Sequence, residues 1–213
     1  VLASNNWTGT PGTNISTYDN VAAGYTRLKD EGVDDADLRA IMSYADKQAL
    51  GGVVVGNTVN LDDIASGVYR KGFDGTVAGI PTMFTQQLPT LTSGTRAASG
   101  ANIKMNAANQ HVNYSAVSVS AAPGQYMSQT INVTVGTASE TVNDGETFVV
   151  AGVNAWDNRL GASLGRQQQF RVIGNYTAAT GVIAAMRIFP AMIVPGSGAG
   201  KAVAVNTANA TVT

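Results

Sequence analysis

The sequence predicts an α+β protein in which a helix-containing region precedes an antiparallel β region. Helix-start and helix-stop signals flank apolar stretches in residues 1–93, which also hold ten of the 14 acidic side chains. After Gly94 charged residues become sparse, and short segments rich in β-branched residues take over. The chain has 213 residues and no cysteine, so it is long enough for one or two domains and forms no disulfide.

Helix and strand signals alternate in the first part of the chain. Ser16 or Thr17 can cap a helix that Gly32 ends, and Gly51-Gly52 is expected to stop a second, shorter helix. We therefore expect helices at 18–31 and 44–50, a strand at 38–43, and a further strand or an apolar loop at 53–55.

The stretch from Asn60 to Gly94 links the two regions. Asn60 is a suitable N-cap and Gly72 a suitable C-terminal stop, which predicts a helix between them. A strand over 76–84 follows. Pro81 restricts this strand to the edge of a sheet or to an irregular course, because proline cannot donate a ladder hydrogen bond.

Six strand candidates follow Gly94. The third alternates cleanly, with Ile131, Val133 and Val135 on one face, as in a strand with one buried side. Six short antiparallel strands close most economically as a small barrel, because closure removes the exposed edges. The candidates are residues 101–106, 114–120, 129–135, 146–152, 168–176 and 181–189, with a turn at 143–145 and a flexible linker at 195–200.

Charge is divided unevenly along the chain. Residues 1–92 carry six basic and ten acidic side chains (6 − 10 = −4), whereas residues 93–213 carry seven and four (7 − 4 = +3). Regions of opposite sign suit head-to-tail self-association, although so few charges can also be uneven by chance. The total of −1 argues against a dedicated nucleic-acid binder, and no apolar run reaches the length of a membrane span.

The chain offers little material for catalysis or metal binding. His111 is the only histidine and lies in a polar, turn-like stretch. The aspartates at 34–37 lack the glycine and the final glutamate of a calcium loop. Residues 196–201 resemble a phosphate loop, but Ala202 stands where a serine or threonine must hold magnesium. We therefore predict no enzyme activity and no catalytic, metal or cofactor site.

Several short motifs occur in the order, and near the spacing, of one protein family. They are Ala65-Ser-Gly-Val-Tyr69-Arg70, Val77-Ala78-Gly79, Leu88-Pro89-Thr90-Leu91-Thr92, Asn143-Asp-Gly-Glu146, Ala151-Gly152-Val153 and Phe170-Arg-Val172. On these residues the chain resembles the central part of the major coat protein of short-tailed Salmonella-type phages, the Lederbergvirus coat family. Because that family's chain is longer, the 213 residues are expected to be part of a larger protein.

The resemblance implies the tailed-phage major capsid fold. In that fold an α/β body with a helix and a peripheral sheet carries an inserted six-stranded antiparallel β-barrel. Residues 1–93 would belong to the peripheral region of the body, 94–194 would form the inserted barrel, and 195–213 would be a linker and the return to the body.

The resemblance also implies a structural function. Many copies would self-assemble, as hexamers and pentamers, into an icosahedral phage head that encloses double-stranded DNA. Scaffolding protein during assembly and the portal protein would be partners, contact with the packaged DNA would be diffuse, and no membrane would be involved. The protein would be located in the virion capsid after assembly in the host bacterial cytoplasm.

Two places are candidate contacts between subunits. In the family, a loop near the start of the inserted domain carries acidic residues that pair with basic partners on a neighbouring capsomer. The corresponding stretch here, residues 106–113, has no carboxylate, so amide hydrogen bonds would have to replace ion pairs. The second place is a predicted surface loop of the barrel around Trp156. The candidate contact residues are Asn106, Asn109, Gln110, His111, Trp156 and Arg159.

Two other function classes stay open at this point. A carbohydrate- or cell-surface-binding β module also fits a sequence rich in glycine, asparagine and threonine, with tryptophans available for interface contacts. A hydrolase has hardly any support, because no nucleophile-elbow motif accompanies the single histidine. Mass in solution separates the coat-protein hypothesis from the binding-module hypothesis, since a binding module stays small and a coat protein forms particles.

Overall fold

The computed structural model of the chain divides into two compact units, residues 8–90 and residues 91–213 together with 1–7. Each unit has a hydrophobic core of its own. The structure describes residues 9, 13–30, 32–34, 38–57, 76–77, 79–96, 103–108, 110, 112, 127–157, 162–192 and 211–212.

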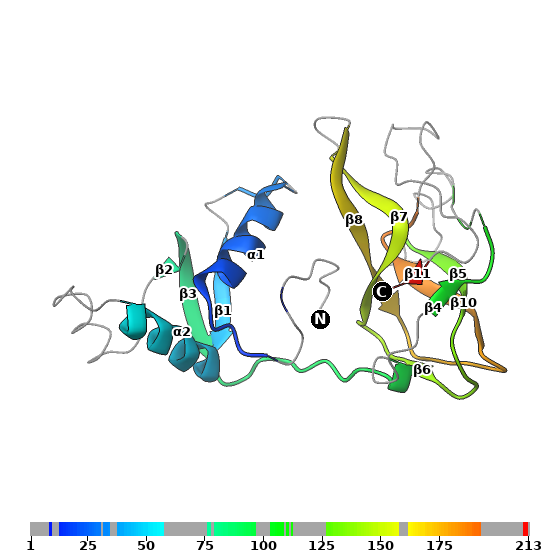
Figure 1. Ribbon diagram of the computed structural model, residues 1–213, viewed down its shortest axis with the longest axis horizontal. Helices are drawn as coiled ribbons and strands as arrows, with labels where there is room; N and C mark the ends of the chain where they lie inside the picture. Colours follow the sequence, from blue (N-terminus) through cyan, green and yellow to red (C-terminus); the bar gives the residue numbers. More distant parts are fainter. Residues whose placement is uncertain are drawn as a thin grey trace. The chain divides into compact units, whose positions relative to one another are not determined.

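Two helices and a small sheet share one core in the unit 8–90 (Figure 1). The elements are α1 (Tyr18–Asp30), β1 (Ala40–Ser43), α2 (Tyr44–Asn57), β2 (Thr76–Val77) and β3 (Ile80–Thr85). The sheet order is β1-β3-β2, with β1 parallel and β2 antiparallel to β3. The helix predicted between Asn60 and Gly72 lies outside the described residues.

The ends of the first helix follow the predicted signals. The hydroxyl of Thr17 accepts a hydrogen bond from the backbone N–H of Asn20 at 3.4 Å, as an N-cap does. At the other end Gly32 adopts φ +85°, and its N–H donates to the carbonyl of Lys29 at 2.9 Å. The prediction of a helix that begins near residue 18 and stops before Gly32 is confirmed.

The second helix is longer than predicted. Gly51 and Gly52 do not stop α2, which continues to Asn57 and includes the segment 53–55 that was expected to be a strand or a loop. Ser43 and Asp46 form a reciprocal cap, since the N–H of Asp46 donates to the Ser43 hydroxyl and the N–H of Ser43 to the Asp46 carboxylate. This cap, and burial of Leu50 in the core, offset the poor helix propensity of the glycines.

The strand predicted at 76–84 is two strands. Gly79, with φ +79°, reverses the chain between β2 and β3, and β3 then lies in the centre of the sheet. Of the two alternatives predicted for the strand with Pro81, an edge position or an irregular course, the edge position is wrong, because β3 has a neighbour on each side. The proline is tolerated because it pairs only with Thr76 of β2, whereas pairing with β1 begins at Thr82.

The unit 91–213 is built around an antiparallel sheet that curls onto itself (Figure 1). Its hydrogen-bonded neighbours run in the closed order β10-β5-β4-β11-β7-β8, and every pair is antiparallel. Two further short strands, β6 and β9, pair with each other. The strands are β4 (Ile103–Met105), β5 (Gln129–Thr134), β6 (Thr141–Val142), β7 (Thr147–Asp157), β8 (Ala162–Ile173), β9 (Tyr176–Thr177), β10 (Val182–Phe189) and β11 (Thr211–Val212).

The members of this closed sheet differ from the six predicted strands. Five of the six predicted strands correspond to β4, β5, β7, β8 and β10. The remaining one, predicted at 114–120, lies outside the described residues. The position between β4 and β7 is filled by β11, which lies in the segment 195–213 that was expected to be a linker and a return to the body. The two residues of β11 are too few to form a periodic pattern that would predict a strand. Only their pairing with β4 and β7 identifies them as one.

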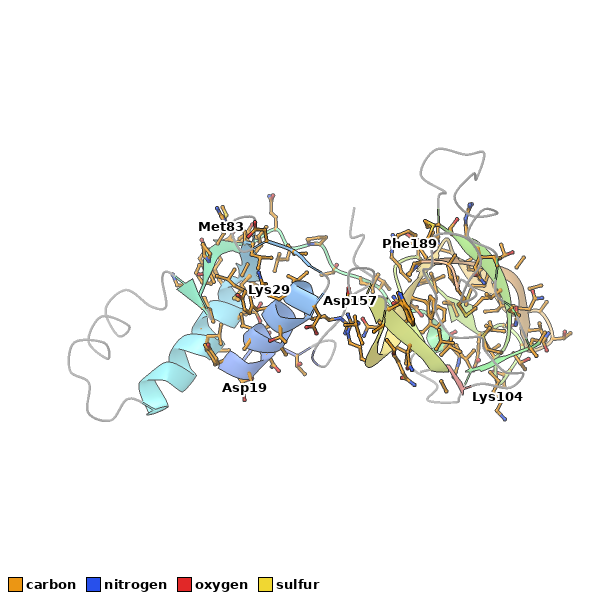
Figure 2. The ribbon with its side chains drawn as sticks, turned by 90° about the horizontal axis from the view of Figure 1, so that it is seen from above. Asp19, Lys29, Met83, Lys104, Asp157 and Phe189 are labelled. Atoms are coloured by element: carbon orange, nitrogen blue, oxygen red, sulfur yellow. The ribbon has the colours of Figure 1, made fainter. Side chains whose placement is uncertain are left out.

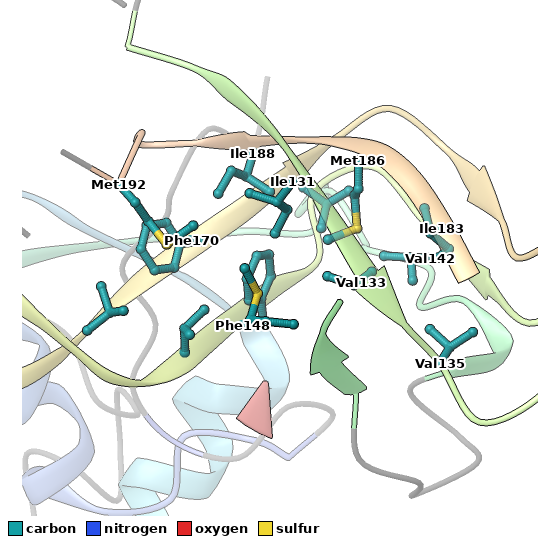
Figure 3. Close-up of a cluster of buried hydrophobic side chains, with 14 of the residues drawn as sticks. Ile131, Val133, Val135, Val142, Phe148, Phe170, Ile183, Met186, Ile188 and Met192 are labelled. Carbon is teal, nitrogen blue, oxygen red and sulfur yellow. The ribbon is translucent and has the colours of Figure 1, made fainter. Parts of the chain in front are cut away.

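The core of the unit 91–213 lies inside the curled sheet (Figure 3). The predicted alternation of β5 is confirmed, because Ile131 and Val133 are buried while Thr130 and Asn132 are exposed. Phe148 of β7 and Phe170 of β8 are register partners, and their ring centroids lie 5.6 Å apart. The coarse prediction, helices with an antiparallel sheet in an α+β protein, is therefore confirmed.

Candidate functional site

The first predicted contact is the loop that follows β4. The N–H of Asn106 continues the ladder to β5 by donating to the carbonyl of Asn132 at 3.0 Å. The side chain of Gln110 returns to the same residue: its Nε2 donates to the Asn132 carbonyl at 2.8 Å, and its Oε1 accepts the Asn132 N–H. The side-chain amide thus adds a second hydrogen bond to the Asn132 carbonyl and also accepts the Asn132 N–H.

A second amide fastens the end of this loop. Gln129 of β5 donates from Nε2 to the backbone carbonyl of Gln110 at 2.7 Å, and its Oε1 accepts the N–H of Met192 at 2.7 Å. The carbonyl of Met192 in turn accepts the N–H of Val112 at 2.9 Å. Gln129 is buried, so these bonds satisfy polar groups that are shielded from water.

The amides expected to reach a neighbouring subunit are therefore engaged inside their own chain. Gln110 bonds to Asn132, and the Asn106 side-chain oxygen accepts a hydrogen bond from the Thr134 hydroxyl at 3.1 Å. Asn109 and His111 lie outside the described residues. Residues 106–108 remain exposed at the tip of the loop, so a contact with a neighbour stays a prediction that involves the tip.

The second predicted contact was a surface loop around Trp156, but the part of it that the structure describes is a strand. Trp156 lies in β7 opposite Ser163 of β8, and its side chain is half-buried. Its indole Nε1 is shielded from solvent and has no hydrogen-bond partner among the described residues. Arg159 lies outside those residues. The flanking polar residues suggested a loop because the long β7–β8 pairing that holds Trp156 is not visible in the local pattern.

A cluster that sequence reasoning did not identify fixes the point where the chain enters the unit 91–213. The carboxylate Oε1 of Glu146 accepts the backbone N–H groups of Gly94 and, at 3.1 Å, of Asn143. Thr95 and Thr141 exchange two hydrogen bonds, each donating its backbone N–H to the other's hydroxyl at 3.0 and 2.9 Å. We call this cluster the Glu146 clamp.

The Glu146 clamp holds an irregular segment to a turn about fifty residues away in the chain. The side chain of Asn143 adds a hydrogen bond from Nδ2 to the carbonyl of Thr92 at 3.0 Å. The spacing from Asn143 to Glu146 is that of a capping box, and this was the one available signal, although no helix follows. The clamp can orient the segment that arrives from the unit 8–90.

A second missed feature is a pair of exposed apolar side chains in the unit 8–90. Ile41 of β1 and Met83 of β3 are register partners in the parallel pair, and both are largely exposed (Met83 is labelled in Figure 2). Alternation along β3 was the available signal, but the sequence does not show which face of a small sheet the helices cover.

The described residues show no constellation typical of a metal site. Among them no group of three or more His, Cys, Asp or Glu side chains is placed to hold a metal ion. Within the same part of the chain, no helix combines the length and the apolar character that a membrane span requires.

Comparison with known proteins gives one result that covers the chain. The family model described as "P22 coat protein - gene protein 5" matches residues 2–213. No curated protein matches the sequence.

Proposed function

Since the chain belongs to the P22 coat protein family and is therefore a structural major capsid protein of a phage head, we propose that its two units have separate tasks in the shell. Residues 1–93 act as the peripheral part of the capsid body and make lateral contacts. Residues 94–194 act as the inserted β-barrel domain, which β11 at 211–212 completes, and the chain leads back toward the body from there. Copies assemble laterally as hexamers and pentamers into an icosahedral shell around double-stranded DNA.

The observation that carries this division is the separateness of the two cores. One cluster of buried side chains lies within the curled sheet, and the other joins α1, α2 and the sheet of the unit 8–90. A domain with its own core can fold as a unit and can be inserted into a larger body. The Glu146 clamp supports the same division, because it binds the incoming segment at Gly94 to the β unit itself.

The antiparallel unit also suits a role in folding. Its strands are hydrogen-bonded to one another in a closed order, so it can form without waiting for the rest of the capsid body. Once formed, it offers a fixed platform at the clamp for the arriving chain. We propose that this unit folds early and nucleates the body, whose contacts would otherwise form slowly.

The remaining partners follow from the proposed assembly. Scaffolding protein would act transiently while the shell forms in the host bacterial cytoplasm, and the portal protein would occupy a vertex. Contact with packaged DNA would be diffuse, since the chain has a net charge of −1 and no strongly basic stretch. None of these tasks requires a catalytic step.

Particle formation tests the proposal. The complete reading frame that contains these residues should be expressed, and particle size should be measured by sedimentation and negative-stain microscopy. Uniform closed shells are expected. A protein that remains a monomer or small oligomer under all assembly conditions would contradict the proposal.

The folding role has a test of its own. A fragment of residues 91–213 should unfold cooperatively in urea, because it contains every strand of the closed sheet. A matched fragment of residues 91–205 lacks β11 and should be markedly less stable, since the gap between β4 and β7 is then unfilled. If the longer fragment is unfolded in isolation, early folding of this unit is wrong.

A further inference from the structure

One face of the sheet in the unit 8–90 is covered by the helices, and the other carries exposed apolar side chains. Met42 of β1 and Phe84 of β3 are register partners and belong to the core with Val21 of α1. Their neighbours along the strands, Ile41 and Met83, are also register partners and are 60% and 59% exposed. Since successive strand residues point to opposite faces, Ile41 and Met83 lie side by side on the face away from the core.

More apolar surface adjoins this pair. Pro81 is exposed on β3, two residues before Met83 and therefore on the same face. A single exposed apolar residue is ordinary, but a contiguous group on one small sheet indicates a contact surface. We call Ile41, Pro81 and Met83 the open face.

Charge indicates what covers the open face. The unit 8–90 carries six basic and ten acidic side chains, so its net charge is 6 − 10 = −4. The unit formed by 91–213, with the uncharged residues 1–7, carries seven basic and four acidic side chains, a net charge of 7 − 4 = +3. An acidic unit with an apolar face is complementary to a basic unit and not to a second acidic one.

Geometry of assembly favours the same occupant. A contact between the same face on two copies joins only two subunits, whereas a contact between two different surfaces generates rings when the rotation closes. Hexamers and pentamers require the second kind of contact. An apolar face on one unit that meets the other unit of the next copy satisfies this requirement.

We propose that the open face is covered in the assembled shell by the β unit, residues 91–213, of a neighbouring copy. This inference rests on the proposed function, because it requires that the chain assembles. The apolar side chains would supply desolvated contact area, and the opposite net charges of the two units would select this pairing and its direction.

Cross-linking from Met83 identifies the occupant. The 213 residues contain no cysteine, so Met83→Cys can be labelled with a photoreactive maleimide without other reactive sites in this segment. Normal and heavy-isotope-labelled copies of the complete chain are mixed, assembled and irradiated, and cross-linked peptides are identified by mass spectrometry. Links to residues 91–213 of another copy are expected. Links within one copy, links to residues 8–90 of another copy, or the absence of links between copies would overturn the inference.

Tyr18→Cys is the matched control. Tyr18 lies on α1 and is 60% exposed, which equals the exposure of Ile41, but it is outside the open face. The label at Tyr18 should therefore give a different pattern of peptides. If both labels capture the same peptides at equal yield, the link at Met83 reports crowding in the shell and the inference is wrong.

Charge substitutions at Ile41 test whether the partner surface is positively charged. Ile41→Lys should raise the protein concentration needed for assembly by roughly tenfold, since it places a positive charge against the basic unit of the neighbour. Ile41→Glu should impair assembly less than Ile41→Lys at low salt, and this difference between the two variants should shrink as salt is added. Assembly of both variants at the wild-type concentration, or a smaller effect of lysine than of glutamate, would overturn the inference.

Folding and assembly can be separated in this design. Because Ile41 is mostly exposed in the single chain, both variants should keep the wild-type urea midpoint before assembly. If either variant is unstable, Ile41→Thr retains a β-branched side chain and still removes apolar surface, so it should impair assembly alone. Wild-type protein that forms no shells would refute the proposed function, whereas normal shells from the Ile41 variants would refute only this inference.

Discussion

The side chain of Gln110 is hydrogen-bonded to both backbone groups of Asn132, where β4 has ended and β5 continues. The amide therefore completes the pairing of Asn132, whose carbonyl also accepts the N–H of Asn106. This arrangement protects the exposed part of β5 and gives the loop after β4 a defined course.

Gln110→Ala tests this role. The substitution removes both bonds to Asn132 and should lower the free energy of unfolding by about 1 kcal/mol, because water can partly replace bonds at an exposed site. Gln167→Ala, at an exposed position on β8, should change stability little. Urea unfolding measures both. Equal effects of the two substitutions would show that the Gln110 amide adds no stability.

Glu146→Ala should loosen the Glu146 clamp. Hydrogen bonds to a charged group contribute about 1.5–3 kcal/mol, and Gly94 and Asn143 both donate to this carboxylate. Arg96 is buried and lies just after the clamped segment, so trypsin reaches it only after local opening. Cleavage at Arg96, followed by mass spectrometry, should accelerate roughly tenfold or more.

Glu146→Gln is the matched control for the clamp. It keeps an acceptor oxygen and removes the charge, so cleavage at Arg96 should accelerate less than in Glu146→Ala. Cleavage at the wild-type rate in both variants would mean that the clamp does not hold the segment.

Gly94 should not tolerate a side chain. A Cβ at this position would lie 2.1 Å from the carbonyl oxygen of Thr141, which is backbone and cannot rotate away. Gly94→Ala should therefore destabilise the chain by about 2 kcal/mol or more. Gly52→Ala is the control, since nothing lies within 4 Å of its added Cβ in α2, and it should stabilise by about 0.5–1 kcal/mol. Urea unfolding distinguishes the expected loss of stability in Gly94→Ala from the expected gain in Gly52→Ala. Equal changes in the two variants would contradict the close approach of Gly94 to Thr141.

Ala185 lies in an irregularity of β10 with φ +55°, a conformation that disfavours alanine. The side-chain oxygen of Asn132 accepts the N–H of Ala185 at 2.9 Å and so holds the bulge in place. Ala185→Gly should stabilise the chain by up to about 1 kcal/mol, whereas Ala184→Gly, at the neighbouring position, should destabilise it. Destabilisation of similar size by both would show that the positive φ does not strain Ala185.

Much of the local structure was predictable because the physical cause lies within a few residues. Thr17 and Gly32 bound the first helix by capping, and the alternation of Ile131 and Val133 gives the buried face of β5. The order of several short motifs also indicated the family that the match over residues 2–213 shows.

Other features could not be predicted because their causes are distant in the sequence. The helix α2 passes Gly51-Gly52 since its packing outweighs local propensity. Trp156 lies in a strand since β8 pairs with β7 beyond the predicted boundary. The candidate contact amide of Gln110 bonds within its own chain, and only the position of Asn132 across the sheet shows this.

The sequence by itself determined the α+β class, the first helix, the face of β5 that is buried, and membership of a phage coat family, because periodicity, capping and short motifs are properties of neighbouring residues. Only the tertiary structure decided that β11 fills the closed sheet, that Glu146 holds Gly94, and that Ile41 and Met83 share an open face. Those relationships join residues far apart in the chain, and the free energy that selects them comes from pairing and burial in the folded molecule.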